Sequence, residues 1–97
     1  MIEVRKTEIF TKWFENLKDR RARARIQARI DRIEMGNFVD IAPVGEGVSE
    51  LLIFYGPGYR VYLVQKNSVV ILLSGGDKSS QQSDITKAKK IAKQIKE

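Results

Sequence analysis

The sequence contains no histidine and no cysteine, and these absences exclude several kinds of chemistry. Without cysteine there is neither a disulfide framework nor a thiolate metal site. Without histidine a Ser–His nucleophile is impossible, and the aspartates and glutamates show no compact metal-ligand spacing. If the chain is an enzyme, its catalysis depends on positioning and electrostatics, and we expect no metal or cofactor.

Long apolar runs are also missing. No segment approaches the roughly 18 residues that a transmembrane helix needs, and Met1–Lys6 lacks the apolar block of a signal peptide. We therefore expect a cytoplasmic protein. The 97 residues, 42% hydrophobic and 31% charged, indicate one domain spanning residues 1–97. The net charge of +6 favours a polyanionic partner: nucleic acid, an anionic membrane or an acidic protein.

The hydrophobic periodicity predicts an α+β fold. Alternation of period 2 indicates a short strand at residues 2–5 and further strands at 48–55, 59–65 and 68–74. Helical spacing indicates one helix capped by Thr7, a second from Asp19 to about Glu34, and a third capped by Ser83 or Asp84. The expected order is β-α-α-β-β-β-α, a four-stranded, mostly antiparallel sheet with a helical hairpin packed on one face.

Aromatic residues recur at helical spacing in the first helix, at Phe10, Trp13 and Phe14. A functional interpretation makes them a stacking platform for nucleic-acid bases. The structural interpretation is a helix face packed on the sheet, and such spacing is typical of a core. We favour the core.

The second helix carries many more cations than anions. Within residues 18–32, only Asp19 and Asp31 oppose the basic residues, which are Lys18, Arg20, Arg21, Arg23, Arg25, Arg29 and Arg32. Like charges at i,i+4 spacing destabilise a helix, so this excess favours contact with nucleic acid or an acidic partner. A solvated basic face is the alternative, because long stems cover apolar surface while their charged ends stay in water.

Two segments place fixed cations near strand ends: Tyr59–Tyr62, which contains Arg60, and the segment from Ser74 to Ser79, which contains Lys78. An arginine on a strand suits bidentate binding of phosphate, although Arg60 could instead pair with a cross-strand carboxylate such as Glu50. Gly75 and Gly76 allow backbone amides to approach an anion. The segment from Ser74 to Ser79 lacks the glycine and lysine spacing of a nucleotide-hydrolysing P-loop. The alternative to anion binding is that this segment is only a flexible connection between a strand and a helix.

Together these motifs resemble a known family. They are Phe10-x-x-Trp13, Leu17-Lys18-Asp19, Ala24-Arg25-Ile26, Gly36-Asn37-Phe38, the segment from Val44 to Leu51, the segment from Gly56 to Tyr62 and the segment from Gly75 to Ser79. In this order, over nearly the whole chain, they resemble the RelE/ParE superfamily of type II toxin–antitoxin toxins, specifically the HigB-like "addiction module killer protein" branch. The family adopts the element order that the periodicity predicts.

The resemblance implies a metal-independent, ribosome-dependent mRNA endoribonuclease. Such toxins cut mRNA in the ribosomal A site through attack of a ribose 2′-OH on the adjacent phosphate. By position, Arg60 and Lys78 match the family's phosphate-contacting cations, and Asp84 is a candidate general base. The resemblance places Tyr62 and the second-helix arginines against RNA, including the 16S rRNA of the A site. It also implies a cognate antitoxin, which binds operator DNA with the toxin.

Two departures from the family pattern keep other functions open. Leu52 stands where this branch normally carries arginine, and no Tyr or His matches the family's carboxy-terminal position, where Ser83 and Asp84 stand. The alternatives are a ParE-like inhibitor of DNA gyrase and a catalytically weak toxin that acts mainly as an antitoxin-bound corepressor.

Overall fold

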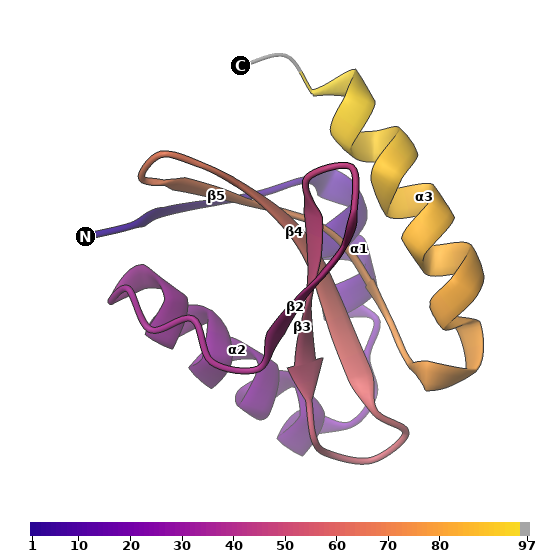
Figure 1. The fold of residues 1–97 in the computed structure, drawn as a ribbon. Helices are drawn as coiled ribbons and strands as arrows, with labels where there is room; N and C mark the ends of the chain where they lie inside the picture. Colours follow the sequence, from indigo (N-terminus) through magenta and orange to yellow (C-terminus); the bar gives the residue numbers. More distant parts are fainter. Residues whose placement is uncertain (96–97) are drawn as a thin grey trace.

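The computed structural model describes residues 1–95, which form one mixed sheet with helices on both faces (Figure 1). The helices are α1 (Glu8–Glu15), α2 (Arg20–Glu34) and α3 (Gln81–Gln94), with a 3-10 turn, η1 (Lys78–Ser80), before α3. The strands are β1 (Glu3–Lys6), β2 (Ile41–Gly45), β3 (Val48–Ile53), β4 (Tyr59–Lys66) and β5 (Val69–Gly76). Within residues 1–95 their order in the sheet is β1-β5-β4-β3-β2; β1 and β5 pair in parallel, and the other neighbouring strands pair antiparallel.

The predicted α+β class and mostly antiparallel sheet are confirmed, but the predicted number of strands is wrong. Within residues 1–95 the sheet has five strands, because β2 pairs antiparallel with β3 over residues to which the periodicity assigned no strand. Pro43 and Gly45 lie in this segment, and both residue types usually interrupt a strand. Pro43 is tolerated because β2 is an edge strand, where a missing backbone donor breaks no ladder on the open side.

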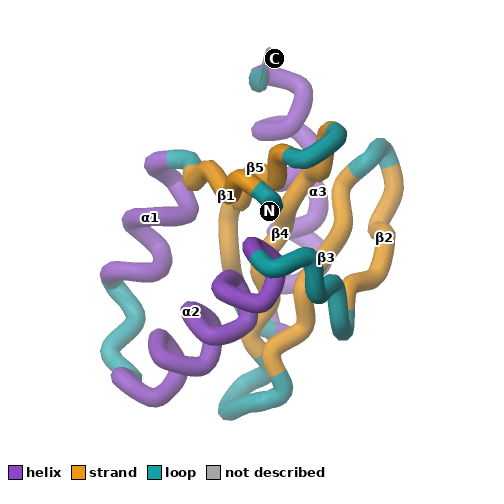
Figure 2. The backbone as a smooth tube through the Cα atoms, turned by 90° about the vertical axis from the view of Figure 1, so that its left-hand side faces the viewer, coloured by secondary structure: helices purple, strands orange, loops and turns teal. Residues whose placement is uncertain are grey.

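Two apolar clusters lie on opposite faces of the sheet. The helical hairpin of α1 and α2 packs on one face, with Phe10, Ile26 and Ile30 against β3, β4 and β5. The third helix covers the other face, where Ala88 and Ile91 meet inward-facing side chains of the same strands. Figure 2 shows α1 and α2 on one side of the strands and α3 behind them. Strand β5 is covered on both faces, since Val70 and Leu72 belong to one cluster and Ile71 and Leu73 to the other.

Local contacts explain where the first two helices begin and end. The Thr7 hydroxyl accepts from the Phe10 amide at 3.0 Å, which is the predicted cap of α1. The carboxylate of Asp19 caps α2 in the same way. After α2, Gly36 adopts a φ of +85°, and the Asn37 amide bonds to the Arg32 carbonyl at 2.8 Å. This pattern closes helices with a left-handed glycine.

The start of α3 differs from the prediction. We expected Ser83 or Asp84 to cap this helix, but α3 begins at Gln81, and η1 precedes it. Asp77 accepts from the Ser79 amide at 2.8 Å, so the capping carboxylate belongs to the 3-10 turn. Asp84 is therefore inside the helix, where it is free to face the sheet.

The aromatic stripe of α1 is part of the core. Phe10 is buried, and its ring lies 5.8 Å from the Trp13 ring and 5.8 Å from the Phe14 ring. The Trp13 ring also meets Tyr59 edge-on at 6.3 Å. The structural interpretation of this stripe is confirmed. Within residues 1–95, none of the helices combines the length and apolar character needed to cross a membrane.

Gly75 is predicted to be required for this packing. A Cβ built at Gly75 would lie 2.3 Å from the Trp13 ring, which Phe10 and Tyr59 hold in place. We expect Gly75→Ala to lower the free energy of unfolding by about 1–3 kcal/mol, the typical cost of overpacking a core. Urea denaturation monitored by circular dichroism measures this loss.

The control places the same change in a Trp13→Leu background. A smaller side chain at position 13 leaves room for the new methyl group, so the cost of Gly75→Ala should be largely removed there. An equal cost in both backgrounds would show that the clash with Trp13 is not the cause.

Candidate functional site

The structure brings Arg60 and Lys78 together beside the turn between β3 and β4. A Cβ built at Gly58 would lie 3.4 Å from Arg60 Nη1 and 3.7 Å from Lys78 Cβ, so both side chains flank this glycine. Arg60 Nη1 donates to the Gly58 carbonyl at 2.8 Å, and the Lys78 amide donates to the Pro57 carbonyl at 3.4 Å. Two segments that are distant in sequence thus place two cations at one end of the sheet.

Arg60 is paired with a carboxylate. Its Nε atom lies 3.6 Å from Glu50 Oε2, and the two side chains are 13% and 9% exposed. The register sets Glu50 opposite Tyr62 and Arg60 opposite Leu52, so the pair is a diagonal contact on the α3 face. Of the two interpretations of Arg60, the structure shows the pairing with Glu50. Lys78 lies outside this pair, and its side chain is exposed.

Glu50 and Gln81 are further members of this site. From the sequence, Glu50 was named only as the alternative partner of Arg60, and Gln81 was not singled out. The Gln81 Nε2 atom lies 3.2 Å from both carboxylate oxygens of Glu50, and it ties the first turn of α3 to β3. The available signal for Glu50 was a carboxylate between Val48 and Leu52, its apolar neighbours on the same face of the strand. Gln81 lies in a polar run, where nothing distinguishes it.

A β-bulge completes this end of the sheet. The β4–β5 register shifts between Tyr62 and Leu63, so that Tyr62 pairs with Ser74 whereas Leu63 pairs with Leu72. Leu73 is the extra residue, and beyond it the alternation of β5 is reversed. Ser74 and Gly76 therefore lie on the α3 face beside Tyr62.

Asp84 lies against the end of β5. A Cβ built at Gly76 would be 1.9 Å from Asp84 Oδ2, so only glycine permits this approach. The Ser80 hydroxyl donates to the same oxygen at 2.5 Å. Asp77, which caps η1, has its pKa lowered mainly by the Ser79 hydroxyl, with a smaller contribution from Arg60. Asp84 thus belongs to the same group of side chains as Arg60, although its oxygen is already engaged.

Tyr62 corrects one prediction. Its side chain is 0% exposed, so the predicted contact with nucleic acid is wrong for this structure. Its hydroxyl, Ser74 Oγ and Arg60 Nε are buried and have no hydrogen-bond partner within residues 1–95. Burial, together with the smaller effect of the negative charges of Glu50 and Asp84, raises the pKa of Tyr62 to about 12.

These side chains form the candidate site, which we call the sheet-end cluster. Its members are Glu50, Arg60, Tyr62, Ser74, Asp77, Lys78, Gln81 and Asp84. Three carboxylates face two cations, so an anionic ligand would first have to separate Arg60 from Glu50. The cluster offers carboxylates as proton acceptors and fixed cations for a phosphate.

The α2 arginines divide into two groups. Arg23 bonds to the Leu17 carbonyl, and Arg29 bonds to the carbonyls of Val39 and Leu52 and pairs with Asp40 at 3.2 Å. These two side chains hold loops in place. The exposed members are Arg20, Arg21, Arg25 and Arg32. The predicted nucleic-acid role therefore remains open mainly for this exposed group.

Comparison with known proteins relates the chain to one sequence relative and one solved fold. No protein-family model matches the sequence. An uncharacterized protein of Haemophilus influenzae is 50% identical over 95 residues, which cover 97% of this chain and 96% of that protein. The chain belongs to the same family as this protein.

A solved structure identifies the fold. The Escherichia coli toxin RelE, solved as a double mutant in the free state, superposes with a TM-score of 0.72 over 97% of this chain and 98% of RelE. The two sequences are 12% identical, so the likeness concerns the fold. The fold of this chain is RelE-like, as the motifs predicted.

Because the Tyr62 hydroxyl is buried, we predict that the free energy of unfolding decreases at alkaline pH. Because its folded-state pKa of about 12 exceeds the ordinary value of 10.0, Tyr62 retains its proton in the folded chain after the unfolded chain has lost it. Stability from this group is complete below pH 10, and about 2–3 kcal/mol is lost as the pH rises to 12. We expect Tyr62→Phe to remove this loss and to leave stability at neutral pH within about 1 kcal/mol, because the hydroxyl has no hydrogen-bond partner among the described residues.

The measurement is denaturation of both proteins between neutral pH and pH 12, together with ultraviolet absorbance of the tyrosinates. The folded wild type should show one late-titrating tyrosine that the variant lacks. Identical tyrosinate titration apart from amplitude, with parallel stability curves, would contradict the assignment.

Proposed function

We propose that this chain is the toxin of a type II toxin–antitoxin module, of the HigB-like branch, and cleaves mRNA on the ribosome. The RelE-like fold supports the proposal at the level of architecture. The observation that carries it furthest is the placement of Arg60 and Glu50 at one end of the sheet beside exposed Lys78. A proton acceptor and two cations at one place meet the needs of RNA cleavage without a metal.

In the proposed reaction the ribose 2′-oxygen forms a bond to the adjacent phosphorus, and the bond from phosphorus to the 5′-oxygen breaks. A carboxylate accepts the proton of the 2′-OH. The guanidinium of Arg60 stabilises the negative charge of the phosphorane, and the Lys78 ammonium neutralises the departing 5′-oxygen, which takes a proton from Lys78 or water. The products are a 2′,3′-cyclic phosphate and a 5′-hydroxyl.

Two carboxylates compete for the role of general base. Asp84 was the candidate from sequence, but its Oδ2 atom accepts from Ser80 and packs over Gly76. Glu50 lies 3.6 Å from Arg60, so a phosphate bound to Arg60 would bring the neighbouring 2′-OH toward Glu50. We assign the base to Glu50 and retain Asp84 as the alternative.

The proposal includes the partners expected of such a toxin. The exposed α2 arginines would contact RNA at the A site, both the 16S rRNA and the bound mRNA, where phosphate charge dominates affinity. A cognate antitoxin with an acidic, partly disordered segment would cover basic surface and fold on binding. Operator DNA would be reached through the antitoxin, and the complex would act in the cytoplasm.

The test is mRNA cleavage in a reconstituted translation reaction. With 5′ end-labelled mRNA, we expect cuts that require both ribosomes and the protein. Glu50→Gln should lower the cleavage rate about 10²–10⁴-fold, the usual contribution of a general base, whereas Asp84→Asn should have a smaller effect. Arg60→Ala should abolish cleavage. Because this change leaves Glu50 buried without its partner, Arg60→Lys, which retains the charge but loses the planar fork, serves as a second variant.

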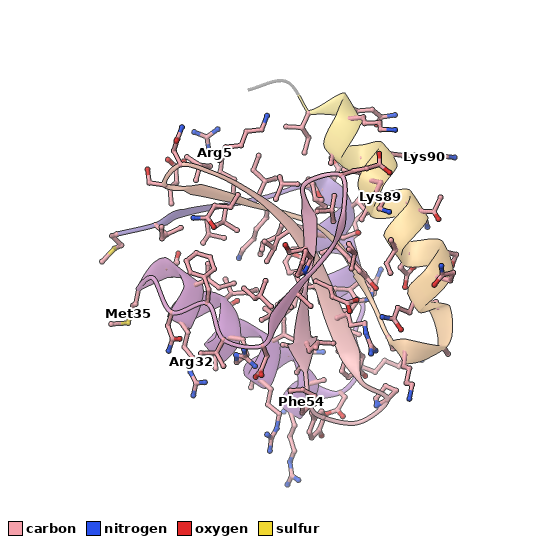
Figure 3. The ribbon with its side chains drawn as sticks, in the orientation of Figure 1. Arg5, Arg32, Met35, Phe54, Lys89 and Lys90 are labelled. Carbon is pink, nitrogen blue, oxygen red and sulfur yellow. The ribbon has the colours of Figure 1, made fainter. Side chains whose placement is uncertain are left out.

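Lys90→Ala is the matched control, since it removes one exposed cation of α3 that points away from the sheet (Figure 3). It should cleave like the wild type. Intact mRNA in the presence of ribosomes and folded protein would overturn the nuclease proposal. Full activity of Arg60→Lys and Glu50→Gln would overturn the assigned site.

The small number of cations available for a phosphate in the sheet-end cluster favours a second function, binding without RNA cleavage. Arg60 is already paired, and Leu52 supplies no additional cation at the position opposite Arg60. Such a site suits a toxin-like binding protein that does not cleave RNA, either an antitoxin-bound corepressor or a ParE-like inhibitor of gyrase. Intact mRNA combined with inhibited supercoiling would identify the gyrase inhibitor.

Leu52→Arg distinguishes these functions. The new guanidinium would stand opposite Arg60 on the α3 face and give a phosphate a further cation. We expect the rate of mRNA cleavage to rise about tenfold or more if the chain is a nuclease, on the scale of one added transition-state donor. Cleavage rates in the reconstituted reaction measure this, with Leu52→Gln as the uncharged control. No gain from arginine over glutamine would contradict the nuclease mechanism.

A further inference from the structure

An aromatic side chain stands exposed next to the arginines of α2. Phe54 follows the last residue of β3 and is 74% exposed, although a phenyl ring gains from burial. It lines a groove of about 290 Å³ together with residues of α2 and β3. The groove is lined by Arg25, Ala28, Arg29, Arg32, Ile53 and Phe54. Figure 3 shows Phe54 and Arg32 both projecting outward from this part of the molecule.

The groove is preorganised. Arg29 bonds to the carbonyls of Leu52 and Val39 and pairs with Asp40, so one wall is held fixed. Arg25 lies 4.7 Å above the ring centroid of Tyr55, and the Tyr55 hydroxyl donates to Asp19 at 3.0 Å. Because the Tyr55 ring holds the Arg25 guanidinium and Asp19 holds the Tyr55 ring, these side chains lose little conformational freedom when a ligand binds.

The chemistry of the lining favours a nucleotide over a peptide. A hydrophobic peptide anchor needs an apolar socket, but Ile53 is only 3% exposed and Ala28 offers one methyl group. The remaining lining consists of three guanidiniums and one phenyl face. Aromatic faces stack on bases while arginines contact phosphates, and this combination is common in proteins that bind single-stranded nucleic acid.

We propose that this groove binds one nucleotide of single-stranded RNA, with the base stacked on Phe54 and the neighbouring phosphate held by Arg32 and Arg25. This subsite rests on the proposed function, because it adds a contact for the RNA that would reach the sheet-end cluster. It differs from general attraction by the basic helix, since it requires a base as well as a phosphate.

The test is fluorescence anisotropy with a short fluorescein-labelled single-stranded oligouridylate and a matched abasic strand, both without ribosomes. We expect Phe54→Ala to weaken binding of the oligouridylate about 5- to 150-fold, the range for loss of one stacked base, and to leave the abasic strand unaffected. Phe54→Trp should retain or strengthen binding. Arg32→Gln should weaken both strands alike.

Met35→Ala is the control, because Met35 is an exposed side chain at the end of α2 and does not line the groove (Figure 3). It should bind both strands like the wild type. Circular dichroism should show Phe54→Ala to be folded, since so exposed a ring contributes little to the core. Wild-type affinity of Phe54→Ala for the oligouridylate would overturn the proposal.

The groove and the nuclease can fail separately. Phe54-dependent binding in a protein that cuts no mRNA would support the subsite and overturn only the catalytic proposal. If Phe54→Ala instead weakens binding of a glutamate-rich peptide and leaves the oligouridylate unaffected, the groove belongs to an acidic protein partner, and the RNA proposal is wrong.

Discussion

The pair of Arg60 and Glu50 is the interaction on which the sheet-end cluster depends. Both side chains are largely removed from water, at 13% and 9% exposed, and an ion pair in this position has a desolvation cost that its attraction only partly offsets. Neighbouring groups reduce that cost: the Gly58 carbonyl accepts from Arg60, and Gln81 donates to Glu50. The turn before β4 and the first turn of α3 are therefore both oriented toward one charged pair.

The bulge in β5 makes this arrangement possible. A regular β5 would turn Ser74 and Gly76 toward α1, whereas the extra residue at Leu73 turns them toward α3. The Leu73 carbonyl also accepts from the Thr7 hydroxyl at 2.7 Å, and Thr7 caps α1. One irregularity thus connects the start of the helical hairpin to the site on the opposite face of the sheet. Bulges that redirect side chains beside functional sites are a known device of sheets.

Much of this fold was predictable from the sequence, for identifiable physical reasons. Alternation and helical spacing are local properties, so β1, β3, β4, β5 and the three helices were found. Strand β2 was missed because Pro43 is a strand breaker except at an edge, and the sequence does not say which strand is at the edge. The bulge at Leu73 was not predicted either. The run Val69–Leu73 is apolar at every position, so its pattern does not show where the side chains change from one face of the sheet to the other.

The site was less predictable than the fold, because residue type does not reveal a partner. Arg29 has the appearance of a solvent-facing cation on a basic helix, yet it bonds to two loop carbonyls and Asp40. Tyr62 neighbours Arg60 in sequence but is completely buried. For Arg60 the residue types left phosphate binding and pairing with Glu50 equally open. Only the register, which sets Glu50 and Arg60 diagonally across β3 and β4, shows that the pairing is formed in this structure.

The register also relates the groove at Phe54 to the cluster at Arg60. Leu52 pairs with Arg60, and opposite residues of antiparallel strands have Cα atoms about 5 Å apart. Phe54 is two residues further along the chain, at most about 7 Å more, so its Cα atom lies within about 12 Å of that of Arg60. The two sites lie on opposite faces of the sheet, but both adjoin the β3–β4 turn. A single strand with one base on Phe54 therefore needs only to pass around this turn for its next phosphates to reach Arg60 and Lys78.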